Sequence, residues 1–178
     1  MHLGGINIRI NSTTLAGTTV LAALVVVFDY TVKYSNLKIP FPWVPTLKFD
    51  FTGIPIALSL LLFGLIPGVF TSVIAFVAIM ARSGNFISSS MKALAELATM
   101  LGMAAGLKVA KKFRLAFTFS IGAAMRVLIM LFFNLFLFPV EMALPIGVFN
   151  IFQGTITIFG GYSIYEAIKR RVPSIIKK

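Results

Sequence analysis

Two charged side chains, Glu96 and Arg126, stand inside long apolar stretches of this sequence. If these stretches form antiparallel helices that turn at residues 111–114, Glu96 lies roughly 22 Å and Arg126 roughly 18 Å from the turn, at similar depth. An unpaired charge inside a membrane is costly, so we expect the two to form an ion pair. The pair can fix the register of two helices, or it can take part in ligand binding or conformational coupling. The spacing leaves both roles open.

Three amide side chains form a second group. Asn134 lies among phenylalanines, and Asn150 and Gln153 are three residues apart and therefore share one helical face. Counting apolar runs places all three on the same side of the membrane. Amides among aromatic rings can hydrogen-bond the edge of a neutral planar ring while the aromatics cover its faces. They can equally serve as hydrogen bonds between helices, and both interpretations stay open.

A polar and aromatic loop separates the first two apolar runs. The Pro-rich stretch 35–46 leads into Leu47–Pro55, with the sequence LKFDFTGIP, which returns directly to apolar residues. A loop so rich in charge and aromatic rings is a candidate lid or wall for a binding site. Before this loop, Asp29 lies one helical turn from Lys33, and we expect these two side chains to pair.

Apolar segments must position these side chains. The chain is 58% hydrophobic and 12% charged, a balance that points to the lipid bilayer as its solvent. The first segment is longer than the apolar part of a signal peptide and no A-x-A-like site follows it, so we expect a retained transmembrane helix. Continuous rather than alternating apolar runs argue against a β-barrel. We therefore predict a single all-α membrane domain over 1–178, with helices at about 13–34, 51–63, 67–82, 91–110, 115–138 and 147–168.

The number of membrane spans is not fixed by these patterns. The second and third segments are short, and GLIPG at 64–68 separates them, so they form either two helices or one helix kinked at Pro67. Six spans place ten basic residues inside and five outside, whereas five spans place twelve inside and three outside. The positive-inside rule thus slightly favours five. Both topologies place the 111–114 turn and the C-terminus in the cytoplasm.

Several kinds of chemistry are not expected. There is no cysteine, and His2 is the single histidine, which argues against a thiolate or histidine metal site. The Walker A, G-x-S-x-G and H-E-x-x-H patterns are absent, and the five acidic residues do not cluster for catalysis. We do not expect an enzyme. The net charge of +11 gathers at the ends of apolar runs, which indicates membrane topology rather than nucleic-acid binding.

Leu47–Pro55, followed by FG-x-x-PG at 63–68, resembles the substrate-binding S components of energy-coupling factor (ECF) vitamin transporters. Among these it is most similar to the riboflavin-specific branch. Gly84–Ile87, the amide-bearing end of the fifth apolar run and Asn150-x-x-Gln153 fall in comparable places. The resemblance spans most of the chain, and the 47–68 region carries its motif.

The resemblance implies six helices with both termini cytoplasmic and an outward-facing pocket under the first loop. It implies a small vitamin as ligand, riboflavin or a related flavin, and no cofactor of the protein's own. Uptake across the prokaryotic plasma membrane would need a membrane coupling subunit and two cytoplasmic ATPases. The coupling subunit would dock on small residues of the first helix, which are here Ala16, Thr18, Thr19, Ala22 and Ala23.

The resemblance also suggests ligand contacts. Asn134 and Asn150 match ring-contacting asparagines, whereas Gln153 stands where a lysine is expected and Gly53 where an acidic residue is frequent. Neutral amides beside a paired Glu96 and Arg126 suit an uncharged ligand such as riboflavin. A phosphorylated flavin would need an unpaired cation, for which Lys48 is the candidate. The predicted ligand-binding residues are Lys48, Phe49, Asp50, Asn85, Asn134, Asn150 and Gln153.

Three other functions stay open at this point. The chain can be an S component for another small vitamin or precursor. It can be an autonomous channel or carrier that needs no partner. It can also be a structural membrane subunit without a ligand, in which case Asn134 and Asn150 have no binding role.

Overall fold

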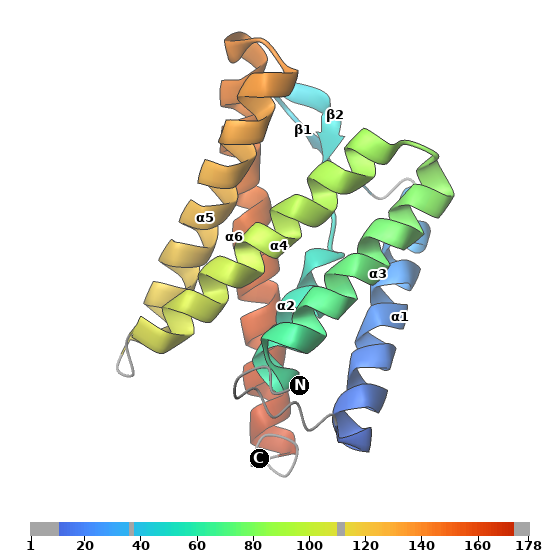
Figure 1. Ribbon diagram of the computed structural model, residues 1–178, viewed down its shortest axis with the longest axis vertical. Helices are drawn as coiled ribbons and strands as arrows, with labels where there is room; N and C mark the ends of the chain where they lie inside the picture. The colour runs from blue at the N-terminus through green and yellow to red at the C-terminus, as the bar shows by residue number, and fades with distance from the viewer. Residues whose placement is uncertain (1–10, 36–37, 110–112, 173–178) are drawn as a thin grey trace, which may run out of the picture.

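A computed structural model describes residues 11–35, 38–109 and 113–172 as a bundle of helices with one short hairpin (Figure 1). The helices are α1 (Ser12–Tyr34), α2 (Gly53–Phe63), α3 (Leu65–Ser83), α4 (Phe86–Val109), α5 (Arg114–Leu137) and α6 (Val140–Arg171). The strands are β1 (Pro40–Phe41) and β2 (Val44–Lys48). Each of the six predicted segments overlaps one of these helices, so the fold class is all-α with the addition of a small hairpin. His2, Arg9 and residues 111–112 of the predicted turn lie outside the described residues.

α2 and α3 are two helices rather than one helix kinked at Pro67. Gly64 ends α2 with a φ of +99°, a conformation that favours glycine. Pro67 lies in the first turn of α3, where its missing N–H costs no helical hydrogen bond. The helices run antiparallel, and the Thr71 hydroxyl donates to Ser59 Oγ across 3.0 Å. Gly64, three residues before Pro67, therefore ends α2 and separates the two helices.

Two helices begin earlier than the apolar pattern predicts. α4 starts at Phe86 rather than near 91, because a cap at Asn85 allows the polar residues of its first turn to be helical. α6 starts at Val140 rather than near 147 and contains Pro145 in its second turn. The first turns of both helices mix polar and apolar residues, so a search for continuous apolar runs does not detect them.

The hairpin lies at one end of the bundle (Figure 1). β1 and β2 are antiparallel, with Pro40 opposite Lys48 and Phe41 opposite Val44. α5 ends and α6 begins at this end, while the first turn of α1 and the last turns of α6 lie at the opposite end. The strands thus place the 47–55 segment over the space between helices.

Glycines bring α4 and α5 into close contact. A methyl group on Gly106 would lie 2.6 Å from the backbone oxygen of Phe117, and one on Gly102 would lie 2.5 Å from that of Ile121. Such backbone approach is typical of helix packing in membranes. A buried core of Val25, Ile56, Met100, Met103 and Ile158 with neighbouring alanines joins the other helices.

Four of the described helices, α1, α3, α5 and α6, are long and apolar enough to cross a membrane by length and composition. α2 is apolar but has only 11 residues. α4 has 24 residues, and polar side chains such as Lys92 and Glu96 interrupt its apolar character. Many large apolar side chains of the bundle, such as Phe70, Leu128 and Phe136, are exposed on its surface. That surface suits contact with lipid.

Candidate ligand-binding cavity

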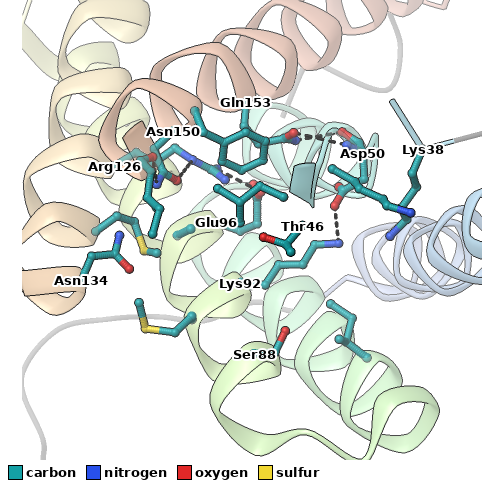
Figure 2. A pocket seen from close by; sticks show the side chains of 18 of the residues that line it. Lys38, Thr46, Asp50, Ser88, Lys92, Glu96, Arg126, Asn134, Asn150 and Gln153 are labelled. Atoms are coloured by element: carbon teal, nitrogen blue, oxygen red, sulfur yellow. Dashed lines mark hydrogen bonds and ion pairs between the residues drawn. The ribbon is translucent and has the colours of Figure 1, made fainter. Parts of the chain in front are cut away.

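A cavity of about 390 Å³ lies beneath the hairpin, within the size range of small-molecule sites (Figure 2). All described helices except α2 contribute side chains to its wall, and Phe138 and the segment from Lys38 to Asp50 contribute the rest. Five of the seven predicted ligand-binding residues line it: Lys48, Asp50, Asn134, Asn150 and Gln153. The ion-pair residues Glu96 and Arg126 line it as well.

Arg126 of α5 joins three helices at the cavity wall. Its Nη1 lies 2.9 Å from Glu96 Oε1 of α4, the pair expected from the sequence, and both side chains are almost fully buried. Nη1 also donates to Thr99 Oγ1 at 3.1 Å, and Nε donates to Asn150 Oδ1 of α6 at 3.1 Å. These hydrogen bonds offset part of the cost of burying the charges. The second carboxylate oxygen of Glu96 has no hydrogen-bond partner among the described residues.

Gln153 holds the hairpin's return segment against α6. Its Nε2 donates to the backbone oxygen of Asp50 at 2.8 Å, and its Oε1 accepts from the Asp50 N–H at 3.2 Å. Asn150 is similarly occupied, because its Nδ2 donates to the Ile146 oxygen at 2.9 Å while its oxygen accepts from Arg126. Two of the three amides that were predicted to hydrogen-bond a ligand ring therefore already have hydrogen-bond partners within the protein.

Asn134 differs from the other two amides. Its side chain lines the cavity from α5 and is 2% exposed, yet its Nδ2 has no partner among the described residues (Figure 2). A buried donor without a partner carries a desolvation cost of about 1–3 kcal/mol. A ligand atom that accepts this hydrogen bond would remove that cost.

Two predicted contact residues do not line the cavity. Phe49 packs its ring 5.1 Å from that of Phe149, a wall residue, and so supports the wall from behind. Asn85 is exposed, and its Oδ1 accepts the backbone N–H of Ser88 at 2.9 Å. Asn85 is a helix cap rather than a cavity residue, since the first turn of α4 begins directly after it.

Asp29 pairs with a different residue from the one predicted. Its buried carboxylate lies 2.6 Å from Arg82 Nε and 3.2 Å from Arg82 Nη2, whereas Lys33 has no ion pair among the described residues. The planar guanidinium of α3 meets both carboxylate oxygens, which a lysine one turn away cannot do. The expected Asp29–Lys33 pair is therefore wrong.

Lys92 of α4 links the helices to the hairpin segment. Its Nζ lies 2.6 Å from Asp50 Oδ2 (Figure 2) and 3.7 Å from Asp29 Oδ1. Burial would raise the pKa of Asp50, but the charge and hydrogen bond of Lys92, with the Thr52 hydroxyl, hold that pKa at about 2. From the sequence, Arg82 and Lys92 were counted only as basic residues that set the membrane topology, and their ion pairs were not predicted. Asp29 and Asp50 were the signal in the sequence, because a buried carboxylate needs a basic partner.

The predicted docking residues of α1 do not share one face. Thr18 and Ala22 are buried inside the bundle, where α1 packs on α2 and α3, while Ala16, Thr19 and Ala23 are exposed. At 100° per residue the mean directions of the two sets differ by about 110°. Only the second set is available to another protein or to lipid.

The apolar helices and the cavity define a multi-pass α-helical membrane protein with a ligand-sized space at one end. No protein-family model and no curated protein matches this chain. A solved structure of the S component of a bacterial ECF transporter is similar in fold, with a TM-score of 0.74 and 20% sequence identity. The similarity covers 93% of this chain and 98% of that one. At this identity it shows a shared fold and leaves the ligand open.

Proposed function

We propose that this chain is the substrate-binding subunit of an ECF-type transporter and that it holds a small vitamin beneath the hairpin. The observation that carries the proposal is a cavity of about 390 Å³, lined on one side by hairpin residues, in a fold similar to an S component over 93% of the chain. In this function the protein binds its ligand and does not transform it.

The LKFDFTGIP motif favours riboflavin or a related flavin as the ligand, with another small vitamin or precursor as the alternative. Asn134 supplies the free hydrogen-bond donor, and Phe149 supplies an aromatic wall. Asn150 and Gln153 have a supporting role in this proposal, because they hold Arg126 and Asp50 in place. Gly53 lacks space for the acidic residue of the riboflavin branch, since a methyl group there would lie 2.6 Å from Glu96 Oε2.

The proposal includes six membrane spans with both termini in the cytoplasm and the hairpin outside, in the prokaryotic plasma membrane. α2 extends over only about 16 Å, so we infer that it crosses as an inner helix shielded by its neighbours, and nearly all of its first eight residues are buried. For six spans, ten basic residues lie on the cytoplasmic side and five outside, which is the sense that the positive-inside rule requires.

ATP-driven uptake would depend on a membrane coupling subunit and two cytoplasmic ATPases, because the chain contains no Walker A motif. Ala16, Thr19 and Ala23 form the exposed small-residue face of α1 that is available to a coupling subunit. These three residues include no glycine, but their side chains are small enough to let another helix approach closely.

The test combines ligand identification with uptake. We expect the detergent-purified chain to retain or bind a small vitamin, and we expect uptake in liposomes only when the coupling subunit and ATPases are present. Asn134→Ala should weaken binding about tenfold, the loss of one buried hydrogen bond. Uptake by the chain alone would instead support an autonomous carrier. Unchanged binding phenotypes in Asn134→Ala and Asn150→Ala would support a structural subunit.

A further inference from the structure

The cavity contains more positive than negative charge. Six basic side chains line it against two acidic ones, and the buried carboxylate of Asp29 stands beside it. The basic residues are Lys33, Lys38, Lys48, Arg82, Lys92 and Arg126, and the acidic ones are Asp50 and Glu96. The sequence had suggested Lys48 as the one candidate for an unpaired cation.

Each acid already has a close basic partner. The pairs are Glu96 with Arg126 at 2.9 Å, Asp29 with Arg82 at 2.6 Å, and Asp50 with Lys92 at 2.6 Å. Lys33 and Lys48 form no ion pair among the described residues. Lys38 reaches only Asp29, at 3.5 Å, whose carboxylate Arg82 already holds. Three lysines therefore remain without an acid of their own.

These lysines lie on the hairpin side of the cavity, in the last turn of α1, before β1 and at the end of β2. Lys33 and Lys48 are exposed, whereas the Lys38 side chain is 12% exposed. Its pKa is lowered, first because burial disfavours the charged amine and then because Lys92 repels it, although Asp50 and Asp29 act in the opposite sense. An unmatched charge in such a place attracts a counter-ion.

The opposite wall has a different character. Asn134 offers its unpaired buried N–H there, and apolar side chains of Met130, Ile146 and Phe149 line the space as well. Figure 2 shows Lys38 and Asn134 on opposite sides of the cavity, so a cation lies toward the hairpin and a neutral hydrogen-bond donor lies on α5.

We propose that the ligand is a small anion whose carboxylate or phosphate is held by Lys33, Lys38 and Lys48, and which presents a hydrogen-bond acceptor to Asn134. Charge-assisted hydrogen bonds to a carboxylate or phosphate are about twice as strong as neutral ones. The inference rests on the proposed binding function and names its substrate class. Among flavins it favours a phosphorylated form over riboflavin.

The experiment compares molecules that differ in one anionic group. Riboflavin 5′-phosphate is measured against riboflavin, nicotinate against nicotinamide, and biotin against biotin amide, by calorimetry on the detergent-purified full chain at pH 7.5. The first pair probes phosphate and the other two probe carboxylate. In any pair that binds, we expect the anion to bind at least about tenfold more tightly. Equal or tighter binding of the neutral member overturns the inference while the binding function stands.

Two variants locate the effect. Lys33→Gln with Lys48→Gln should reduce the preference for the anion to about twofold or less, and Lys38→Gln should reduce it in the same direction. Lys108→Gln is the matched control, because Lys108 is exposed in the last turn of α4, outside the cavity, and should leave the preference intact. A preference that survives all three cavity substitutions overturns the assignment of these lysines.

Inorganic phosphate decides the case in which no pair binds. At constant ionic strength, phosphate should raise the melting temperature of the wild-type chain above its value in chloride, and the Lys33→Gln, Lys48→Gln variant should lose that rise. This result with no organic ligand bound supports the anion site and counts against vitamin binding. No rise in the wild-type chain overturns the inference.

Discussion

The guanidinium of Arg126 joins α4, α5 and α6, because it contacts Glu96, Thr99 and Asn150 within 3.1 Å. Removing one charge of a buried pair leaves the other without compensation, whereas removing both does not. At the scale of single residues, the stability of the bundle therefore depends more on the balance of charge than on either side chain.

We expect Arg126→Ala to lower stability by about 3–5 kcal/mol, and Glu96→Ala with Arg126→Ala to lower it less. Thermal unfolding in detergent measures both. The exposed pair Glu166–Lys169, at 3.3 Å, is the control, and Glu166→Ala should change stability by about 0.5 kcal/mol or less. Equal losses in the single and double variants would contradict the expectation.

Asp50 should make stability depend on acidity. Its pKa is about 2 in the folded chain against 3.8 as the ordinary value, so the unfolded chain takes up the proton first as pH falls. The stabilisation, about 2 kcal/mol, is complete above 3.8 and is lost as pH falls toward 2. Melting temperatures between pH 5 and pH 2.5 should fall less in Asp50→Asn than in the wild type. Glu166→Gln should follow the wild type.

At the scale of elements, the packing of α4 on α5 depends on glycine. A side chain at Gly106 meets the backbone of α5, which cannot rotate away as a side chain can, whereas a methyl group on Gly147 has its nearest atom at 3.9 Å. A larger side chain should therefore be tolerated at position 147 and not at position 106.

We expect Gly106→Val to cost about 2 kcal/mol or more, because the helices must separate. Gly147→Ala should be neutral or stabilising by up to about 1 kcal/mol. Thermal unfolding of the two variants checks the contrast. A Gly106→Val chain as stable as the wild type would show that α4 and α5 do not approach this closely.

At the scale of the whole molecule, the absence of cysteine makes the proposed orientation directly measurable. Pro42→Cys, in the exposed hairpin turn, should react with a membrane-impermeant maleimide in intact cells. Lys108→Cys, exposed at the end of α4, should react only after the membrane is permeabilised. The reverse labelling pattern would show that the topology is the opposite of the proposed one. Labelling of both cysteine variants in intact cells would show that the reagent enters the cells.

Much of this molecule was readable from the order of its residues. Apolar runs predicted the helices because a chain in lipid must satisfy its backbone hydrogen bonds within each helix. Glu96 and Arg126 were expected to pair because neither charge is stable alone in an apolar surrounding. The hairpin was not expected, since two short strands containing Pro40 and Pro45 have almost no local strand signal.

The tertiary structure alone decided which polar groups meet. Asp29 pairs with Arg82 rather than Lys33, Asn134 keeps a free donor while Asn150 and Gln153 do not, and the lysines of the hairpin side outnumber the acids they face. These outcomes depend on how each helix is tilted and rotated against its neighbours. An apolar run specifies that a helix forms, but close packing of side chains from several helices sets its rotation, and that information is spread over residues far apart in the sequence.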